Sequence, residues 1–452
     1  MNKDVVVVGG GPAGLIAAVT AKSVNPDKSV CVIKAIGDGV IPCAIPYMVD
    51  TMDDPKKNVM GDMPLQNAGV DIVVDEAVGL DTETRELTLA SGDTFTFDKL
   101  VLATGTEAVL PPIPGVDREG VYTIRKSMTD TVALRETFQS CRNVVIVGGG
   151  FIGAEFADEL GDMDNLEVHL VELMSDLLPA AFDEEFCRDV RRRLEAKGIV
   201  VHTGVRVTAI EGDSHVDGVV LDDGVKLDAD AVLVSIGAKP NVDLAVEGGL
   251  RLAGDGSIWV DDYMRTNVDG IFAVGDCAEK RDFFTRKPVP VWLASTATAE
   301  ARVAGTNLYG IRVLRQIPGT ISAFSTQING VAFASAGMTC RASEREGFRY
   351  VCATTEAPDR HPGTLPGATP MKVKLVFADQ SGILLGGQAS GGPSVGELIN
   401  VIAVAIQKKV TVRELDMMQI ATHPLLGPSP TVHPLINAAH AALAKMRAAA
   451  GR

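Results

Sequence analysis

A cysteine between two prolines is the residue in this sequence best suited to redox chemistry. Cys43 follows Pro42 and precedes Pro46, shortly after the second expected strand. Proline fixes φ and removes a backbone donor, so both prolines should stiffen the segment and hold the sulfur in place. If a helix begins near Cys43, its unpaired N–H groups would favour the nucleophilic thiolate. The alternative is a small buried cysteine that serves only packing.

The seven cysteines show no other pattern that indicates a site. None of them forms a C-x-x-C pair, and their spacing fits neither zinc ligation nor a disulfide framework. We therefore expect no metal site, and we expect the thiols to be reduced.

Composition narrows the classes of function. A chain of 452 residues predicts about two to four domains. The formal net charge of −16 disfavours nucleic acid as a partner, since such binding relies on basic patches, and is typical of a well-solvated surface. The first residues lead straight into a strand, and no apolar run is long enough to span a bilayer. These features favour a cytoplasmic protein that does not bind membranes.

A glycine motif near the N-terminus predicts a dinucleotide site. A β-branched strand at 4–8 leads into G-x-G-x-x-G at residues 9–14, and an apolar helix follows. In this pattern Gly9 allows the tight turn, Gly11 admits a pyrophosphate, and Gly14 lets the helix pack on the strand. The next strand ends at Lys34, where the fingerprint expects an acidic residue that accepts ribose hydroxyls.

A second copy of the motif begins at residue 148. Gly148, Gly150 and Gly153 follow a strand at 144–147, and the next strand ends at Glu172. A carboxylate at this position grips a ribose 2′-hydroxyl and repels a 2′-phosphate, which predicts NADH over NADPH. The alternative is an ordinary acidic residue at a strand end.

Three further stretches complete the expected layout. A buried strand runs into Ala103-Thr104-Gly105, and another ends at Gly275-Asp276, where the carboxylate would bind a flavin ribitol or cap a helix. From residue 323 onward, antiparallel strands and helices alternate, including a half-buried strand at 371–377 and a capping box at Thr411. A sheet with helices on one side suits an interface domain.

The order of these motifs resembles the FAD- and NAD(P)H-dependent pyridine nucleotide-disulfide oxidoreductases. The segment 43–47, Cys-Ala-Ile-Pro-Tyr, is similar to the C-G-x-P-Y of their single-cysteine branch, which includes CoA-disulfide reductases, NADH oxidases, NADH peroxidases and persulfide or polysulfide reductases. The resemblance implies an α/β fold with two Rossmann-like domains and a C-terminal α+β dimerisation domain. FAD would bind residues 1–113 and 245–320, NAD(H) residues 114–244, and a homodimer would form through 321–452.

The resemblance also implies the site residues. Cofactor contacts are expected at Gly9, Gly11, Pro12, Ala13, Gly14, Lys34, Pro42, Ala103, Thr104, Gly105, Gly148, Gly150, Phe151, Ile152, Gly153, Glu172, Gly237, Gly275 and Asp276. Glu155 would lie near the nicotinamide, and Cys43 would be the redox-active thiol. His423 of the partner subunit would protonate the leaving thiolate, a task suited to a group that titrates near neutrality. His361 and His433 are the alternatives for that role.

Two positions bear on the substrate. Pro12 stands where peroxidases and water-forming oxidases place a histidine, which disfavours peroxide and dioxygen. CoA-disulfide reductases carry several arginines on the first helix. In this chain only Lys22 provides a positive charge that matches them. We therefore expect reduction of a low-molecular-weight disulfide, persulfide or polysulfide with NADH. The alternatives are an NADH oxidase acting on dioxygen and an electron-transfer subunit that serves a partner redox protein.

Overall fold

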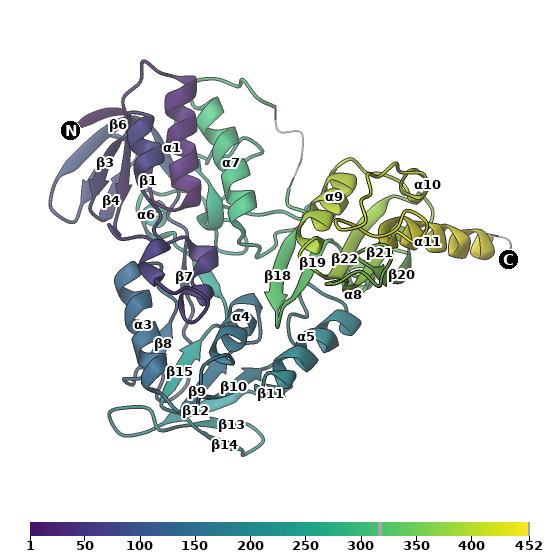
Figure 1. Cartoon of the computed structure of the whole chain (residues 1–452). Helices are drawn as coiled ribbons and strands as arrows, with labels where there is room; N and C mark the ends of the chain where they lie inside the picture. Colours follow the sequence, from purple (N-terminus) through teal and green to yellow (C-terminus); the bar gives the residue numbers. More distant parts are fainter. Residues whose placement is uncertain (315–318, 451–452) are drawn as a thin grey trace. The chain divides into compact units, whose positions relative to one another are not determined.

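The chain divides into two units, and the computed structural model describes residues 1–314 and 319–450 (Figure 1). Unit 1 comprises Met1–Leu110, Thr123–Gln139 and Ile236–Thr320, and unit 2 comprises Pro111–Tyr122, Ser140–Ser235 and Ile321–Arg452. Among the described helices, none has the length and apolar character needed to cross a bilayer.

Unit 1 is organised around a seven-stranded sheet with the order β3-β2-β1-β6-β5-β4, on which β17 pairs with β6. The strands are β1 (Asn2–Val8), β2 (Val30–Lys34), β3 (Asp71–Val74), β4 (Ala77–Asp81), β5 (Glu86–Leu89), β6 (Thr94–Leu102) and β17 (Ile271–Ala273). Strand β1 pairs in parallel with β2 and β6, and its β-branched residues from Val5 to Val8 are buried in the core. This is the central position that the unbroken apolar run predicts.

The helices of unit 1 pack through small residues. They are α1 (Pro12–Val24), α2 (Met63–Asn67), α3 (Met128–Ser140), α6 (Asp243–Glu247) and α7 (Ala294–Asn307). Figure 1 shows α1 and α7 side by side. A Cβ added to Gly305 would lie 2.8 Å from the carbonyl oxygen of Ala17, so only glycine allows this close approach.

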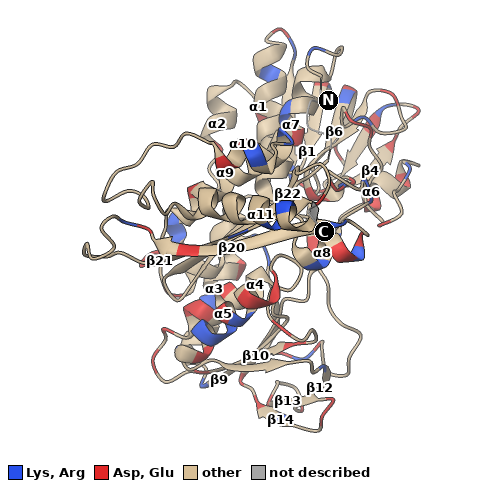
Figure 2. Ribbon diagram, turned by 90° about the vertical axis from the view of Figure 1, so that its right-hand side faces the viewer, with Lys and Arg blue, Asp and Glu red and all other residues tan. Residues whose placement is uncertain are grey.

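Unit 2 contains a five-stranded sheet with the order β11-β10-β9-β15-β8 and a three-stranded antiparallel sheet. The elements are β8 (Val121–Thr123), β9 (Asn143–Val147), α4 (Phe151–Leu160), β10 (Glu167–Glu172), α5 (Glu184–Ala196), β11 (Val200–Thr203), β12 (Val207–Glu211), β13 (Gly218–Leu221), β14 (Lys226–Asp228) and β15 (Ala231–Val234). Basic and acidic residues alternate along α5 (Figure 2), which includes an ion pair between Arg191 and Glu195 at 2.8 Å.

The C-terminal part of unit 2 is an antiparallel sheet with the order β18-β19-β22-β21-β20. Its elements are β18 (Phe324–Ile328), β19 (Val331–Gly337), α8 (Cys340–Arg345), β20 (Tyr350–Pro358), β21 (Pro370–Ala378), β22 (Leu384–Gly391), α9 (Val395–Gln407), α10 (Val412–Asp416) and α11 (Pro434–Ala450). Thr411 and Glu414 form the predicted capping box. The two Rossmann-like sheets and this α+β region confirm the predicted fold class.

Strand β21 differs from the expectation of a half-buried strand, because both of its faces are covered. On one face, a Cβ at Gly387 of the neighbouring strand would meet Ile402 of α9 at 2.9 Å. On the other face, Lys374 reaches Asp183 at 2.9 Å and Glu185 at 2.6 Å, and its side chain is 9% exposed. The alternating lysines of β21 therefore contact acidic side chains within unit 2, and the sheet has covering elements on both sides.

Candidate functional site

The first glycine turn is closed on its protein side and open at the start of α1. Gly9 has φ +119°, and a Cβ there would lie 2.1 Å from the carbonyl oxygen of Ala103. A Cβ at Gly14 would lie 1.9 Å from the carbonyl oxygen of Gly9, whereas one at Gly11 would meet nothing within 4 Å. Gly11 is the N-cap of α1 and has no side chain to occupy the helix N-terminus. This cradle fits the pyrophosphate of a dinucleotide.

Lys34, which departs from the fingerprint, forms an ion pair within unit 1. Its Nζ lies 2.7 and 2.9 Å from the two carboxylate oxygens of Asp62. Its stem runs over the glycine turn, because a Cβ at Gly10 would lie 2.8 Å from the Cβ of Lys34. Asp62 thus brings a carboxylate to the end of β2, where the motif expects one. The sequence alone did not predict this ion pair, because Asp62 lies 28 residues after Lys34 and belongs to no motif that links the two.

A buried ion pair fixes the turn that carries Asp276. Lys280 and Glu300 are each 3% exposed, and their charged atoms lie 3.0 Å apart. Lys280 also donates to the carbonyl of Gly275, whose own N–H donates to Glu300 at 3.1 Å. Gly275 has φ +74°, and a Cβ there would lie 2.8 Å from the Cβ of Ala13 in the first turn of α1. The pair therefore holds Asp276 next to the first glycine turn.

The small-residue turn after β6 is joined to a later segment of unit 1. The hydroxyl of Thr104 donates to the carbonyl of Asn241 at 2.6 Å, and the N–H of Asn241 donates to Gly105 at 2.9 Å. Next to it, β7 (Thr106–Ala108) pairs with β16 (Ala238–Pro240). Gly237, which has φ +119°, accepts a hydrogen bond from the N–H of Val109 at 3.1 Å. These contacts hold the segments 104–109 and 237–241 against each other.

Cys43 lies in a 3₁₀ turn, and the helix considered from the sequence does not form. The turns η1 (Pro42–Ala44) and η2 (Pro46–Met48) follow one another. Pro46 has no N–H to donate to the carbonyl of Pro42, so the α-helical bond fails and Ile45 donates instead at 3.2 Å.

Side chains of unit 1 anchor these two turns. Asn58 donates to the carbonyl of Ile41 at 3.1 Å, and Arg135 donates to that of Met48 at 3.0 Å. Cys43 itself is exposed. The backbone that carries the sulfur is thus fixed while the residue stays accessible.

The other two cysteines of unit 1 are poor nucleophiles. Burial raises the pKa of Cys31 to about 11. Burial also raises the pKa of Cys277, whose thiol contacts the carbonyl of Leu102 at 3.5 Å. Since the thiolate is the reactive form, burial disfavours reaction at Cys31 and Cys277, whereas Cys43 of the same unit is exposed.

The second glycine turn has the same construction in unit 2. A Cβ at Gly153 would lie 1.9 Å from the carbonyl oxygen of Gly148, whereas one at Gly150 would meet nothing within 4 Å. Glu172 accepts the N–H of Gly149 at 2.6 Å through Oε2 and that of Met174 at 2.6 Å through Oε1. The carboxylate is therefore fixed at the turn, as a ribose-binding acid requires.

The residues after this turn contact strand β18. The ring of Phe151 stacks on that of Phe324 with centroids 5.1 Å apart, and Ile152 is exposed. The Glu155 carboxylate accepts the hydroxyl of Thr326 at 2.7 Å. Burial raises the pKa of Glu155 to about 7, so this carboxyl group takes up or releases a proton near neutrality.

The three candidate histidines differ in environment. His423 is exposed, and its Nδ1 accepts the N–H of Leu425 at 3.2 Å, so the neutral ring carries its proton on Nε2. His361 holds the same loop through its ring, which contacts the carbonyl of Gly427 at 2.9 Å. Burial lowers the pKa of His433, and its Nδ1 has no hydrogen-bond partner in the described part of the chain. Of these three histidines, His423 is the exposed one.

The predicted residues fall into two local groups. Unit 1 holds Gly9, Gly11, Pro12, Ala13, Gly14, Lys34, Pro42, Cys43, Ala103, Thr104, Gly105, Gly237, Gly275 and Asp276. Unit 2 holds Gly148, Gly150, Phe151, Ile152, Gly153, Glu155, Glu172 and His423. Each unit therefore contains its own glycine turn with the open approach that a dinucleotide requires.

Comparison with known families decides the class of this chain. Residues 3–301 match the pyridine nucleotide-disulphide oxidoreductase family, and residues 325–432 match the dimerisation domain of the same family. The chain belongs to this family. It is an NAD(P)H-dependent flavin oxidoreductase, and both glycine turns have the open construction that its FAD and NAD(P)H need.

Proteins similar to this oxidoreductase include both NADH oxidases and sulfur or persulfide reductases. It is 32% identical to an NADH oxidase of Methanocaldococcus jannaschii, over 98% of this chain and 99% of that one. It is 31% identical to an NAD(P)H sulfur oxidoreductase (CoA-dependent) of Pyrococcus abyssi, over 95% and 96%. Among solved structures, an NAD-dependent persulfide reductase from A. fulgidus matches with a TM-score of 0.91 and 31% identity, over 99% of this chain and 84% of that one.

Proposed function

We propose that this oxidoreductase uses NADH to reduce a low-molecular-weight disulfide, persulfide or polysulfide at Cys43. The observation that carries the proposal is the exposed Cys43 in its fixed 3₁₀ turn, within the unit that holds the first dinucleotide turn. Cys31 and Cys277 of that unit are buried. The sulfur and persulfide reductases among its relatives support the same substrate class.

The cofactor assignments follow the two glycine turns. Residues 1–113 and 245–320 bind FAD through the first turn, Lys34 with Asp62, and Asp276. Residues 114–244 bind NADH through the second turn, and residues 321–452 form a homodimer. When bound, FAD would supply the two-electron chemistry that links NADH oxidation to sulfur reduction.

NADH is the preferred donor because of Glu172. Its carboxylate is fixed by two backbone N–H groups at 2.6 Å each. One lone pair on each oxygen remains to accept a ribose hydroxyl, whereas a 2′-phosphate there would meet a like charge.

The chemistry at Cys43 is thiol–disulfide exchange. The Cys43 thiolate attacks one sulfur of the substrate, forms a new S–S bond to it and displaces the other sulfur as a thiolate. The imidazolium form of His423 of the partner subunit donates a proton to that leaving thiolate and is left as the neutral ring. Two electrons that enter from NADH then cleave the S–S bond on Cys43 and release the second sulfur. Because this cycle needs a reduced thiol, we place the enzyme in the cytoplasm.

A second candidate is oxidation of NADH by dioxygen. The NADH oxidase of Methanocaldococcus jannaschii, with 32% identity, favours it. Pro12 argues the other way, because it leaves the first glycine loop without a side-chain acid for cleavage of an O–O bond. Transfer of electrons to a partner redox protein is the third possibility.

Steady-state rates separate these activities. NADH consumption is measured without oxygen in the presence of CoA disulfide, glutathione persulfide or inorganic polysulfide, and separately in air without a sulfur acceptor. We expect at least one sulfur acceptor to exceed the rate in air. A faster rate in air than with all three sulfur acceptors would favour the oxidase. Intact mass of the purified enzyme identifies any sulfur species attached to Cys43.

A further inference from the structure

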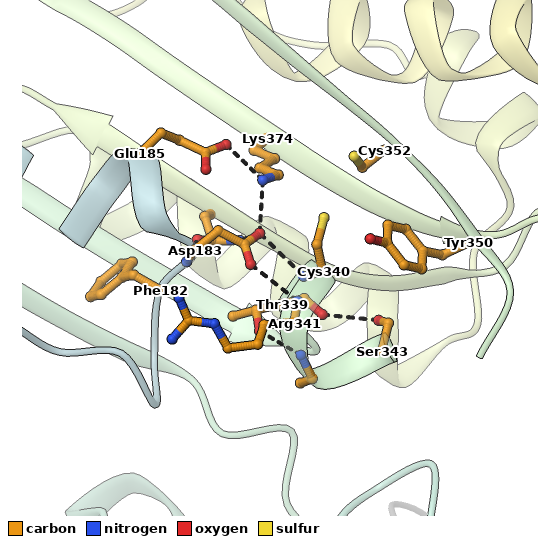
Figure 3. Close-up of polar contacts among 12 residues, drawn as sticks. Phe182, Asp183, Glu185, Thr339, Cys340, Arg341, Ser343, Tyr350, Cys352 and Lys374 are labelled. Atoms are coloured by element: carbon orange, nitrogen blue, oxygen red, sulfur yellow. Dashed lines mark hydrogen bonds and ion pairs between the residues drawn. The ribbon is translucent and has the colours of Figure 1, made fainter. Parts of the chain in front are cut away.

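Unit 2 contains a pair of thiols that the proposed reaction does not use. Cys340 is the first residue of α8, Cys352 lies in β20, and both are half-buried. Each thiol shifts the pKa of the other. Figure 3 shows the two side chains close to Lys374 and Tyr350.

Hydrogen bonds fix the backbone on which both cysteines sit. The N–H of Cys340 donates to the Asp183 carboxylate at 3.1 Å, and Thr339 caps α8 by accepting the N–H of Ala342 at 3.0 Å. Lys445 donates to the carbonyl of Cys352 at 2.8 Å. The thiols are therefore held near each other by elements that are separately anchored.

The pair lies on the side of the sheet opposite α11. Thr355 of β20 donates to the carbonyl of Pro434 at the start of α11, at 2.7 Å. Successive side chains of a strand point to opposite faces, so Cys352 points away from α11. This is the face on which Lys374 of β21 contacts Asp183.

Their surroundings give the two thiols different chemical roles. The hydrogen bond from Cys340 lowers the pKa of Cys352, and the positive charges of Lys374 and Lys445 act in the same direction against burial and Asp183. The same hydrogen bond and burial raise the pKa of Cys340. Cys352 is therefore the thiolate, and Cys340 keeps its proton and donates it.

We propose that Cys340 and Cys352 form a second thiol–disulfide exchange site, independent of Cys43, whose oxidant is a low-molecular-weight disulfide. Cys352 Sγ attacks one sulfur of R–S–S–R, forms a mixed disulfide and displaces R–S⁻. Cys340 Sγ then attacks Cys352 Sγ, closes the intramolecular disulfide and displaces the second R–S⁻.

The electrons and protons of this reaction balance. The two cysteines lose two electrons, and R–S–S–R gains them. The two thiolates take up one proton from Cys340 and one that Cys352 released on ionising. The product is a protein disulfide and two small thiols, so neither NADH nor the flavin takes part.

The test uses the full FAD-loaded chain with Cys43→Ser, so that the proposed catalytic thiol is absent. The protein is treated with excess 2-hydroxyethyl disulfide without NADH, quenched in acid, alkylated and mapped by mass spectrometry without reduction. We expect a disulfide that links the peptides of Cys340 and Cys352. Adding Cys340→Ser should trap the mixed disulfide on Cys352, and adding Cys141→Ser should leave the linked product unchanged. Absence of the linked peptide in the folded, FAD-loaded protein overturns the proposal.

A second readout tests the thiolate directly. At pH 7 we expect iodoacetamide to alkylate Cys352 about tenfold or more faster than Cys141, whose thiol pKa is raised by burial. Cys340→Ser keeps a hydrogen-bond donor and should preserve this rate, whereas Cys340→Ala should slow it. Equal rates for Cys352 and Cys141, or equal rates in the two Cys340 variants, contradict the proposed role of the pair. These outcomes do not depend on whether Cys43 is catalytic.

Discussion

Glu172 accepts the N–H of Gly149 at 2.6 Å, which fixes a carboxylate at the second glycine turn. Glu172→Ala removes the acceptor for the ribose and the charge that repels a 2′-phosphate. Because hydrogen bonds to a charged group contribute about 1.5–3 kcal/mol, kcat/KM for NADH should fall roughly 10- to 100-fold. The value for NADPH should fall less or rise.

The matched control for this substitution is Glu167→Gln, at the other end of β10, where the side chain is 60% exposed. It should leave both cofactors unaffected. An unchanged ratio of NADH to NADPH efficiency in Glu172→Ala would show that Glu172 does not select the cofactor.

Glu155 should make the stability of the protein depend on pH. Burial raises its pKa in the folded state to about 7, above the ordinary value of 4.5, so the native state binds more protons between these values. The free energy of unfolding therefore falls as pH rises through that window. Glu155→Gln removes this penalty and should be more stable than the parent by about 1–3 kcal/mol at pH 8, with no gain at pH 4.

Urea unfolding of the FAD-loaded protein without NADH, followed at both pH values, measures this difference. In Glu155→Gln the amide oxygen of the new side chain can still accept the Thr326 hydroxyl, so the comparison isolates the charge. Parallel stability curves for the parent and Glu155→Gln would mean that folding does not raise the pKa of the carboxyl group.

Removing one partner of the buried pair of Lys280 and Glu300 should strongly destabilise unit 1. Glu300→Ala leaves the Lys280 ammonium buried without its carboxylate, which destabilises by about 3–5 kcal/mol. The double variant Lys280→Met with Glu300→Leu should recover much of this loss, because no uncompensated charge remains. FAD release during urea unfolding reports the effect on the Asp276 turn.

An exposed ion pair provides the control for the buried one. Lys239 and Glu107 are 64% and 55% exposed, so Glu107→Ala should change the free energy of unfolding far less than Glu300→Ala does. Similar losses from Glu300→Ala and Glu107→Ala would refute the role given to burial.

His423 should act as an acid in turnover. His423→Gln keeps a polar side chain but cannot act as an acid, so kcat with a sulfur acceptor should fall about 10²- to 10⁴-fold. His440→Gln is the control, since His440 is also exposed and pairs with Asp416 at 2.9 Å. If both variants keep the parental kcat, the proton comes from another source.

Local sequence patterns were sufficient to predict the two dinucleotide turns. An apolar strand, a glycine at the turn and a helix are adjacent in the chain, so β1 with α1 and β9 with α4 were recognisable directly. The capping box at Thr411 and Glu414 was equally local. Each of these signals lies within about 25 residues and depends on backbone geometry that only certain residue types adopt.

Features that depend on distant partners were not predictable. Asp62 beside Lys34 and Glu300 beside Lys280 are pairs formed by tertiary packing, and neither has a sequence signature. Strand β22 was missed because Leu-Leu-Gly-Gly-Gln-Ala-Ser-Gly lacks β-branched residues. Its Gly386 is required by packing, since a Cβ there would lie 2.1 Å from the carbonyl oxygen of Met338.

Turnover of Cys43→Ser tests the central claim most directly. NADH-dependent reduction of CoA disulfide, glutathione persulfide and polysulfide is compared in this variant, in Cys141→Ser and in the parent, each checked for full FAD content. The account predicts that Cys43→Ser falls to the background rate with the acceptor that the parent uses best, while Cys141→Ser keeps the parental rate. Full turnover of Cys43→Ser with every acceptor would contradict it.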